Sequence, residues 1–481
     1  MDERPRNVVL IGFLAGAAAA LAYLIPYASP GLAIVIAVLL YFFRTWTWKV
    51  NSFLIFGFVF ATVYEFLILS WAWNTSFYLS SPGIGVPFFG ALALIFFTLT
   101  LISLVAGITF LPWIYVAVKA RSAPVFDVLI LAGVWVVCEW FRIVFLSALS
   151  YGDGVLNPPY LSFGMIGYSL ADYGGMLPLV HYGGIYSLSF FLAAAGGVLF
   201  YGYRAIKNEN MRTLVLGMVG IVFFVVIGST WVHGHEAPGK EFVPITLVTK
   251  YSYPAAPSYG DEVAYAQEQP TLVVLPEGSR EFFPLELIPV SSLHTGGGVI
   301  DSYPKGQYIQ NEKSIPGAYM VTAATTTLVR EKHALAPYGE FTPLAMNILA
   351  RLTGFTKTLE QFTRQRHYTQ GSYESVFTFE NARGSIIFCD EIAVPGIAKD
   401  IVAKTRANII IAVASTHWFP KGYMLHRETI RMAKVRAVEA GVPIARSAYG
   451  DPAFVVDASG NLVYEGSWED SSIKTIPVPL P

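Results

Sequence analysis

The 481-residue sequence has few charged residues, which make up 14% of the chain, whereas 54% of it is hydrophobic. A soluble globular domain carries roughly 25% charged residues, so much of this chain must lie in lipid. The charges also lack an excess of one sign, because the formal net charge is −1, and no basic patch with interleaved aromatic residues occurs. We therefore expect no nucleic acid among its partners.

Cysteine is equally scarce. The two cysteines are Cys138, inside an apolar run, and Cys389, far away in the polar half. One distant pair implies no disulfide framework, so each cysteine needs its own explanation. His233 and His235 lie in a polar linker and are interpreted as ordinary surface residues, so the sequence predicts no metal and no cofactor.

Long apolar segments fill the first 232 residues. A helix needs about 20 mostly apolar residues to cross a bilayer. This pattern predicts seven transmembrane spans, at residues 8–25, 30–43, 52–72, 88–117, 126–147, 180–203 and 213–232. No small-residue cleavage site follows the first apolar stretch, so we interpret it as a retained span rather than a signal peptide.

The loops between these spans alternate in charge. Lys and Arg precede the first span and follow the second, fourth and sixth, whereas loops 26–29, 73–87 and 148–179 contain neither. Because Lys and Arg are retained on the cytoplasmic side, the N-terminus is predicted to be cytoplasmic. We expect a multi-pass protein of the cytoplasmic (inner) membrane whose segment after the seventh span is extracytoplasmic.

Aromatic and charged residues near the span ends allow two interpretations each. The aromatic residues are Trp71, Trp73, Phe77, Tyr78, Tyr151, Tyr160, Tyr168 and Tyr173. They form either an interfacial belt or, in loop 148–179, part of a mouth for acyl chains.

Charges at Glu65, Glu139 and Arg142 are expensive in a span unless they are paired. Glu139 and Arg142, three residues apart, either pair on one helix face or bind a lipid headgroup.

A polar domain follows the spans, and we place the domain boundaries at 1–232 and 240–481. Near-continuous apolar strands are predicted at 271–275, 384–389 and 408–414, as expected for strands that are covered on both faces. A helix is predicted at 424–440, and a hairpin that turns at Ser-Gly-Asn is predicted within 454–464. The fold class is thus an α-helical transmembrane bundle joined to an α/β sandwich.

Three reactive residues follow predicted strands. They are Glu277 in Leu-Pro-Glu-Gly-Ser, Lys332 in Arg-Glu-Lys-His-Ala and Cys389 in Phe-Cys-Asp-Glu-Ile. A thiol becomes a strong nucleophile when a base takes its proton and a cation stabilises the developing oxyanion, so this set suits acyl transfer. Taken singly, Cys389 also fits a structural cysteine. Glu277 and Lys332 each also fit a solvated surface charge.

These segments, in this order, resemble the nitrilase (carbon-nitrogen hydrolase) superfamily, and their fusion to seven spans resembles the apolipoprotein N-acyltransferase family. The motifs are Leu275-Pro-Glu-Gly, Lys332 to Pro343, Cys389-Asp-Glu, Ala414 to Phe419, Arg431 to Ser447, Glu139-Trp-Phe-Arg142 and Gly167-Tyr-Ser. The resemblance covers nearly the whole chain and implies an αββα sandwich for the polar domain.

The resemblance also implies a ping-pong acyl transfer without a cofactor. Glu277 would deprotonate Cys389, which attacks an ester of a membrane phospholipid and keeps the acyl group as a thioester, while Lys332 stabilises the oxyanion. The acceptor would be the α-amine of a diacylglyceryl-cysteine apolipoprotein. Supporting roles are implied for Glu340, beside Lys332, and for Glu391, at the nucleophile elbow. The candidates for substrate binding are Trp418, Tyr338, Glu139 and Arg142.

The sequence departs from the family in four places. The segment between Pro244 and Thr271 is shorter than expected and has Leu-Val-Thr-Lys where the family has a strand end with glutamine and asparagine. It has Thr416-His-Trp-Phe419 where the family has Asp-Ala-Trp-Phe, and Ser447-Ala-Tyr-Gly450 where the family has Thr-Asn-x-Gly, so acceptor recognition is expected to differ. The family generally has another transmembrane helix after the catalytic domain, and without one we expect that domain to be tethered at one end. A monomer is the simplest expectation.

Two alternatives to acyl transfer remain open. One is a membrane-anchored nitrilase-type amidase or hydrolase that uses the same three residues but passes the acyl group to water. The other is a relative without activity that binds lipid or lipoprotein.

Overall fold

The computed structural model describes most of the chain. The described residues are 7–45, 50–81, 87–119, 123–152, 155, 160–207, 241–251, 264–265, 267–278, 295–305, 315–337, 340–354, 356, 368–468 and 471–481. The chain divides into two compact units. The first consists of Met1–Ala72, Ala93–Leu146 and Ser162–His235, and the second of Trp73–Leu92, Ser147–Leu161 and Glu236–Pro481.

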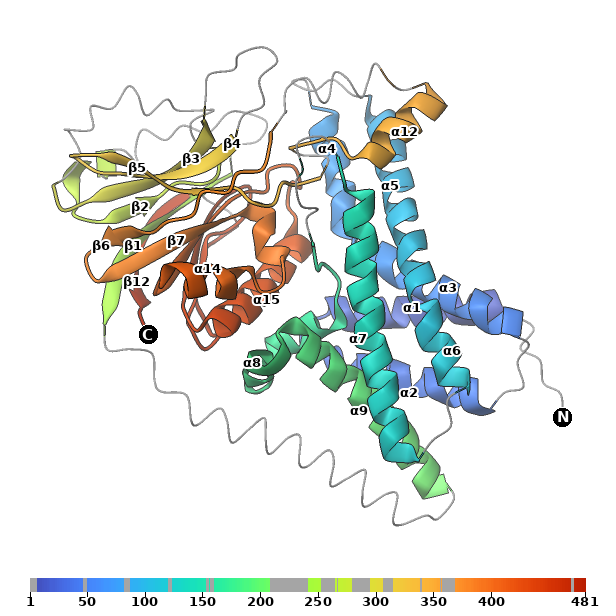
Figure 1. Ribbon diagram of the computed structural model, residues 1–481. Coiled ribbons are helices and arrows are strands. Elements are labelled where there is room, and N and C mark those ends of the chain that lie inside the picture. Colours follow the sequence, from blue (N-terminus) through green and yellow to red (C-terminus); the bar gives the residue numbers. More distant parts are fainter. Residues whose placement is uncertain are drawn as a thin grey trace. The chain divides into compact units, whose positions relative to one another are not determined.

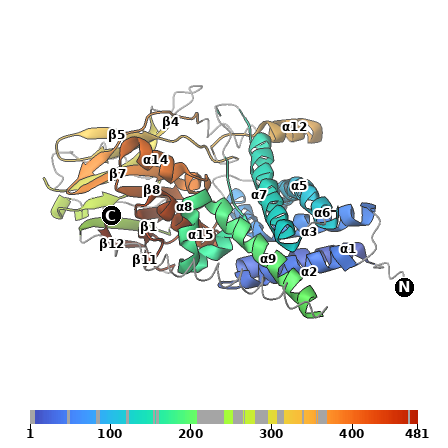
Figure 2. The ribbon, with the colours of Figure 1, turned by 60° about the horizontal axis from the view of Figure 1, so that its bottom comes forward.

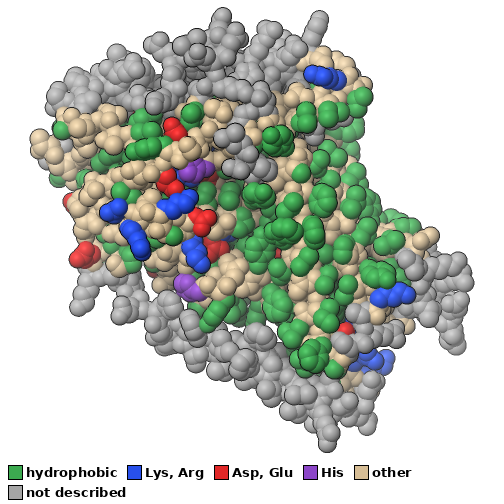
Figure 3. All heavy atoms as spheres, viewed as in Figure 1, with side chains coloured by type: hydrophobic (Ala, Val, Ile, Leu, Met, Phe, Trp, Pro, Cys, Tyr) green, Lys and Arg blue, Asp and Glu red, His purple; other side chains and the backbone are tan. Residues whose placement is uncertain are grey.

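Apolar helices build the first unit, as the hydropathy pattern predicts. They are α1 (Val8–Leu24), α2 (Ser29–Thr45), α3 (Val50–Ile68), α5 (Phe88–Thr109), α6 (Leu111–Lys119), α7 (Pro124–Leu149) and α9 (Ile185–Lys207). Hydrophobic side chains gather over the surface of these helices (Figure 3). Such a surface is stable in lipid rather than in water.

Four helical segments among the described residues are long and apolar enough to cross a membrane. They are Asn51–Ile68, Phe88–Lys119, Pro124–Leu149 and Ile185–Lys207, while α1 and α2 are shorter apolar helices. Six of the seven predicted spans therefore coincide with apolar helices. The seventh, at 213–232, lies outside the described residues.

Small residues let α1 pack closely on α3. A Cβ atom added to Gly12 would lie 2.9 Å from the carbonyl oxygen of Phe56, and one added to Gly16 would lie 2.5 Å from that of Phe60. Close approach over small residues is a common way for membrane helices to associate. Short elements connect the long helices: η1 (Ser70–Asn74), α4 (Thr75–Leu79), η2 (Ile166–Asp172), η3 (Gly174–Leu179) and α8 (Val180–Gly183).

A sheet of twelve strands dominates the second unit. The strands are β1 (Phe242–Lys250), β2 (Leu272–Val274), β3 (Gly298–Lys305), β4 (Ile315–Val321), β5 (Thr326–Glu331), β6 (Phe377–Phe379), β7 (Ala382–Phe388), β8 (Ile409–Ser415), β9 (Ile444–Tyr449), β10 (Phe454–Val456), β11 (Leu462–Glu465) and β12 (Ser472–Pro479). Their main order is β5-β4-β3-β2-β1-β9-β8-β7-β6. The neighbours from β3 through β2, β1, β9 and β8 to β7 are parallel.

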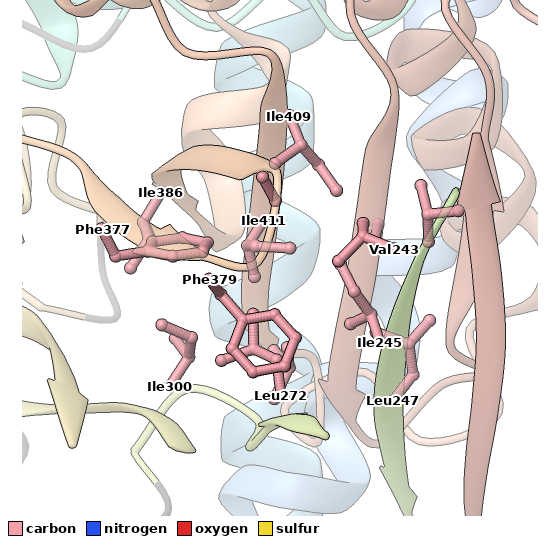
Figure 4. Close-up of a cluster of buried hydrophobic side chains, with 14 of the residues drawn as sticks. Val243, Ile245, Leu247, Leu272, Ile300, Phe377, Phe379, Ile386, Ile409 and Ile411 are labelled. Atoms are coloured by element: carbon pink, nitrogen blue, oxygen red, sulfur yellow. The ribbon is translucent and has the colours of Figure 1, made fainter. Parts of the chain in front are cut away.

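This sheet curls around one apolar core. Alternate residues of β1, such as Ile245, share a buried cluster with Ile300 of β3, Phe377 of β6 and Ile411 of β8 (Figure 4). Strands from both halves of the sheet thus face each other across the same side chains, which is the arrangement of a sandwich. The predicted αββα class is confirmed, as are the three predicted strands, which correspond to β2, β7 and β8.

Helices cover the outer face of the half that contains β7 and β8. α14 (Ile397–Thr405) and α15 (Tyr423–Ala440) lie side by side there (Figures 1 and 2). The predicted helix at 424–440 is α15, and β10 and β11 form the predicted hairpin. The remaining described helices are α12 (Leu344–Thr353) and the 3-10 turn η7 (Cys389–Ala393).

Candidate active site

The three reactive residues follow the carboxyl ends of β2, β5 and β7. β2 and β3 are parallel, and two antiparallel steps from β3 through β4 bring β5 back to the same direction. The carboxyl ends of such strands meet at one edge of a sheet, where α/β proteins commonly bind ligands. The Glu277 N–H donates to the carbonyl oxygen of Ala414 at 3.3 Å, which links the end of β2 to the end of β8. Local strand pairing thus brings distant parts of the sequence together.

Lys332 lies at the centre of this edge. Its side chain is only 1% exposed, and its Nζ donates to Glu277 Oε1 at 3.0 Å and to Glu340 Oε1 at 2.8 Å. The second oxygen of Glu340 accepts from the Ala336 N–H at 2.7 Å. Glu340 therefore holds Lys332 in place, and Lys332 in turn touches the carboxylate proposed as a base.

Asp390 is a third carboxylate at Lys332, and the sequence motifs alone did not single it out. Its Oδ1 lies 3.1 Å from Lys332 Nζ. Its other oxygen, Oδ2, is buried without a hydrogen-bond partner among the described residues. The clue available in the sequence was its position directly after Cys389. Its direction toward Lys332 depends on the backbone turn there, which no local pattern reveals.

Burial and crowding of like charges set the proton affinities in this cluster. Burial, together with the negative charges of Glu340 and Asp390, raises the pKa of Glu277 to about 8, although Lys332 acts in the opposite sense. Burial also raises the pKa of Asp390 to about 7. The surrounding carboxylates raise the pKa of Lys332 well above its ordinary value, so this side chain remains a cation. A carboxyl group with a pKa near neutral suits proton transfer at physiological pH.

Cys389 directly follows β7 and is the first residue of the 3-10 turn η7. Its φ angle is +21°, a backbone conformation that non-glycine residues rarely adopt and that is frequent at functional sites. The thiol donates to the carbonyl oxygen of Ser415 at 3.7 Å. Burial and the charge of Glu277 raise the pKa of the Cys389 thiol, while Lys332 lowers it. The resting thiol is therefore protonated, and its activation requires a base.

Glu391 joins the two segments that carry Lys332 and Cys389. One carboxylate oxygen accepts from the N–H groups of His333 and Ala334 at 2.8 and 3.1 Å. The other accepts from the Phe388 N–H at 2.9 Å and forms an ion pair with the buried Arg330. Arg330 and these hydrogen bonds lower the pKa of Glu391 despite its burial, so it stays ionised.

An aromatic cluster lies beside the carboxyl end of β8. Tyr78 of α4 packs on Trp418 and His417, with ring centroids 4.8 and 5.1 Å apart, and His417 stacks on Tyr449 at 4.7 Å. The Oγ atom of Ser415 lies 2.7 Å from His417 Nδ1. Trp418 is thus near the residue that accepts from the Cys389 thiol, whereas Tyr338 lies outside the described residues.

The two membrane candidates occupy the first unit and hold the backbone there. Arg142 Nη1 binds both carboxylate oxygens of Glu65 at 2.6 and 2.7 Å, and Nη2 donates to the Phe163 carbonyl at 2.6 Å. Glu139 accepts from the Ile166 N–H at 2.9 Å. The partner of Arg142 is therefore Glu65 of α3 rather than Glu139 of its own helix. Both residues anchor the segment that leads into η2.

The structure thus combines apolar helices, four of them long enough to cross a membrane among the described residues, with an α/β sandwich domain. Comparisons with known proteins are more specific. Residues 15–198 match the family model described as the apolipoprotein N-acyltransferase N-terminal domain. The motif-based resemblance to the apolipoprotein N-acyltransferases is confirmed.

Individual relatives support the same family over most of the chain. The apolipoprotein N-acyltransferase of Pseudomonas aeruginosa strain PAO1 is 23% identical over 403 residues, which cover 78% of this chain and 73% of that protein. The corresponding protein of Pseudomonas putida is 21% identical over 369 residues, with 72% and 67% covered.

Solved structures also match about half of the chain. A CN-hydrolase superfamily protein from Xanthomonas campestris is 15% identical, with a TM-score of 0.35, and covers 49% of this chain and 91% of its own. A carbon-nitrogen hydrolase from Helicobacter pylori is 14% identical, with a TM-score of 0.37, and covers 50% and 89%.

Proposed function

We propose that this protein is an acyltransferase of the membrane that moves a fatty acyl chain from a phospholipid to the N-terminal amine of a diacylglyceryl-cysteine lipoprotein. The observation that carries the proposal is the buried Lys332 ammonium, which contacts Glu277 next to the turn that presents Cys389. A base, a fixed cation and a nucleophile at one sheet edge are the groups that acyl transfer needs. The names of the relatives support the choice of acceptor.

In the first half-reaction, the sulfur of Cys389 attacks the ester carbonyl carbon while Glu277 takes the thiol proton. The carbonyl oxygen becomes an oxyanion that Lys332 stabilises. When the carbon-oxygen bond breaks, the leaving alkoxide of the lysophospholipid takes the proton back from Glu277. An acyl thioester remains on Cys389.

In the second half-reaction, the neutral amine of the lipoprotein attacks the thioester carbonyl. Glu277 accepts a proton from the attacking nitrogen, and Lys332 again faces the oxyanion. The carbon-sulfur bond breaks, and the sulfur recovers the proton. The products are an amide and the free thiol, so the enzyme returns to its starting state with one lysophospholipid released per turnover.

The same proposal assigns a location. The charge pattern of the loops supports a cytoplasmic N-terminus in the inner membrane and a domain at 240–481 on the outer face. On that face the domain has access to phospholipid and to exported lipoproteins. No residue from a second chain is needed for the reaction, so a monomer is sufficient.

Variants of the three residues test the proposal. Purified full-length protein is incubated with phospholipid and a diacylated lipopeptide, and N-acylated lipopeptide is quantified by mass spectrometry. We expect Cys389→Ala to abolish product and Glu277→Gln or Lys332→Met to lower the rate by roughly 100-fold or more. Lys404→Met, on the exposed face of α14, serves as the control.

Two results would contradict the proposal. Wild-type product formation in Cys389→Ala would exclude the thiol as nucleophile. Release of free fatty acid in place of N-acylated lipopeptide would instead identify a hydrolase.

A further inference from the structure

Helix α12 presents an apolar face that is exposed among the described residues. Leu344, Ile348 and Leu352 are 54%, 51% and 80% exposed. Residues spaced by four lie on one face of a helix, so the three side chains form a stripe. Met346 and Ala350, on the other side of the helix, are buried. A contiguous exposed stripe of large apolar residues indicates a contact surface.

The start of α12 is bonded to the end of a candidate membrane span. The Leu344 N–H donates to the Tyr151 carbonyl at 2.7 Å, and Pro343 forms an isolated antiparallel bridge with Gly152. Tyr151 follows α7, whose apolar segment ends at Leu149. The residue after a span lies at the level of the lipid headgroups, so the start of α12 lies there too.

A glycine makes this close approach feasible. A Cβ atom at Gly152 would lie 2.5 Å from the Thr342 carbonyl oxygen, which is closer than real Cβ contacts allow. The contact between the span end and α12 therefore depends on the absence of a side chain at this position.

The charge of α12 fits a lipid surface. Its only charged residue is Arg351, which is exposed and lies seven residues after Leu344, so it extends from the same side of the helix. A long cationic side chain next to an apolar stripe can reach phosphate groups while its stem remains in apolar surroundings. This combination is typical of helices that lie in the membrane interface.

We infer that α12 is an interfacial helix that rests on the membrane surface, with Leu344, Ile348 and Leu352 in the acyl boundary and Arg351 at the phosphates. α12 begins shortly after Glu340, the carboxylate that holds Lys332. Lipid contact by α12 therefore fixes the Lys332 segment at the membrane surface. The inference concerns lipid contact only and does not require the proposed acyl transfer.

A fluorescent label on the apolar stripe tests this inference. The full-length protein carries Cys389→Ala, which removes the reactive thiol, while the buried Cys138 is left unchanged. Ile348→Cys is labelled with the environment-sensitive dye NBD, and the protein is placed in nanodiscs of phosphatidylcholine and phosphatidylglycerol. Lys404→Cys on α14, where the side chain is 66% exposed, is the matched control.

We expect the label at residue 348 to emit at shorter wavelength than the label at 404 and to be quenched several-fold more by lipids that carry nitroxide groups. The same label at Leu352→Cys should behave like that at 348, which guards against misfolding of a single variant. Equal quenching at 348, 352 and 404 would overturn the inference. A blue-shifted label that lipid nitroxides do not quench would indicate a second copy of the chain on this face and would also overturn it. Because Cys389 is absent, neither result bears on acyl transfer.

Discussion

Lys332 contributes one positive charge to a cluster in which Glu277, Glu340 and Asp390 each contribute a carboxyl group. Buried like charges at such short separation do not all ionise together, so the cluster retains protons that an exposed set would lose. The raised pKa values of Glu277 and Asp390 follow from this crowding and from burial. The cluster thus has a proton affinity suited to catalysis near neutral pH.

The first prediction at the residue scale concerns pH. Glu277 must be deprotonated to take the proton of Cys389, and its pKa is raised to about 8, so the protonated, inactive form persists to higher pH than for an ordinary carboxyl group. We expect the rate of acylation of Cys389 to fall as pH decreases through about 8. Rapid-quench measurements with phospholipid give this profile. A midpoint near the ordinary value of 4.5 would contradict the role of Glu277.

A second residue-scale prediction concerns Asp390. Its negative charge helps to raise the pKa of Glu277, so Asp390→Asn should move the midpoint of that pH profile down by roughly one unit. Asp400→Asn, an exposed carboxylate on α14, should leave the midpoint unchanged. A profile that is the same in both variants would show that Asp390 has no effect on the base.

At the scale of elements, the site depends on how firmly the ends of β5 and β7 are joined. Glu391 makes this connection through three backbone N–H groups and Arg330. Removing one partner of a buried ion pair leaves the other charge unpaired, which costs about 3 to 5 kcal/mol. Loss of either partner alone is therefore expected to destabilise the second unit.

We expect Glu391→Gln to destabilise the full-length protein by about 3 kcal/mol or more, measured as a lower midpoint in chemical denaturation in detergent. The double variant Arg330→Met/Glu391→Gln should recover part of this loss, because the buried Arg330 charge is removed as well and Glu374, its other partner, keeps its contact with Lys404. If the double variant is less stable than the wild type by the sum of the losses measured for Glu391→Gln and for Arg330→Met, the two residues do not act as a pair.

Local sequence patterns predicted the elements well and their long-range partners poorly. The apolar runs and the Ser-Gly-Asn turn were sufficient for β2, β7, β8 and the hairpin, because strand and turn preferences act within a few residues. The pairing of Arg142 with Glu65 was missed because it joins two helices. The position of Asp390 beside Lys332 was missed because it depends on the backbone turn at Cys389, whose positive φ angle no local pattern reveals.

At the scale of the whole molecule, the two parts of the chain are suited to different solvents. The helices have apolar surfaces, which are stable in lipid, whereas the sheet domain buries its apolar side chains in a core. The described helices include four that are long and apolar enough to cross a membrane, and the sheet domain buries its core between two layers of strands. The predicted orientation rests on loop charge, which the sequence alone carries. This division into an apolar helical part and a sheet domain agrees with the proposed reaction, whose substrates are anchored in lipid.

Cysteine labelling tests the predicted orientation. In a Cys389→Ala background, Lys404→Cys should react with a membrane-impermeant maleimide in intact spheroplasts, whereas Lys207→Cys, at the end of α9, should react only after lysis. Both side chains are exposed, so accessibility through the membrane is the variable that differs. Labelling of Lys207→Cys before lysis, with Lys404→Cys protected, would contradict the predicted orientation and indicate the opposite one.

The most direct test of the central claim is a two-step chase of the acyl group. The purified full-length protein is loaded with a phospholipid that carries an isotope-labelled acyl chain, the donor is removed, and a diacylated lipopeptide is added. We predict a hydroxylamine-sensitive acyl mass on the peptide that contains Cys389, followed by its one-for-one transfer to the amine of the lipopeptide. Formation of N-acylated lipopeptide without any acyl group on Cys389 would contradict this account.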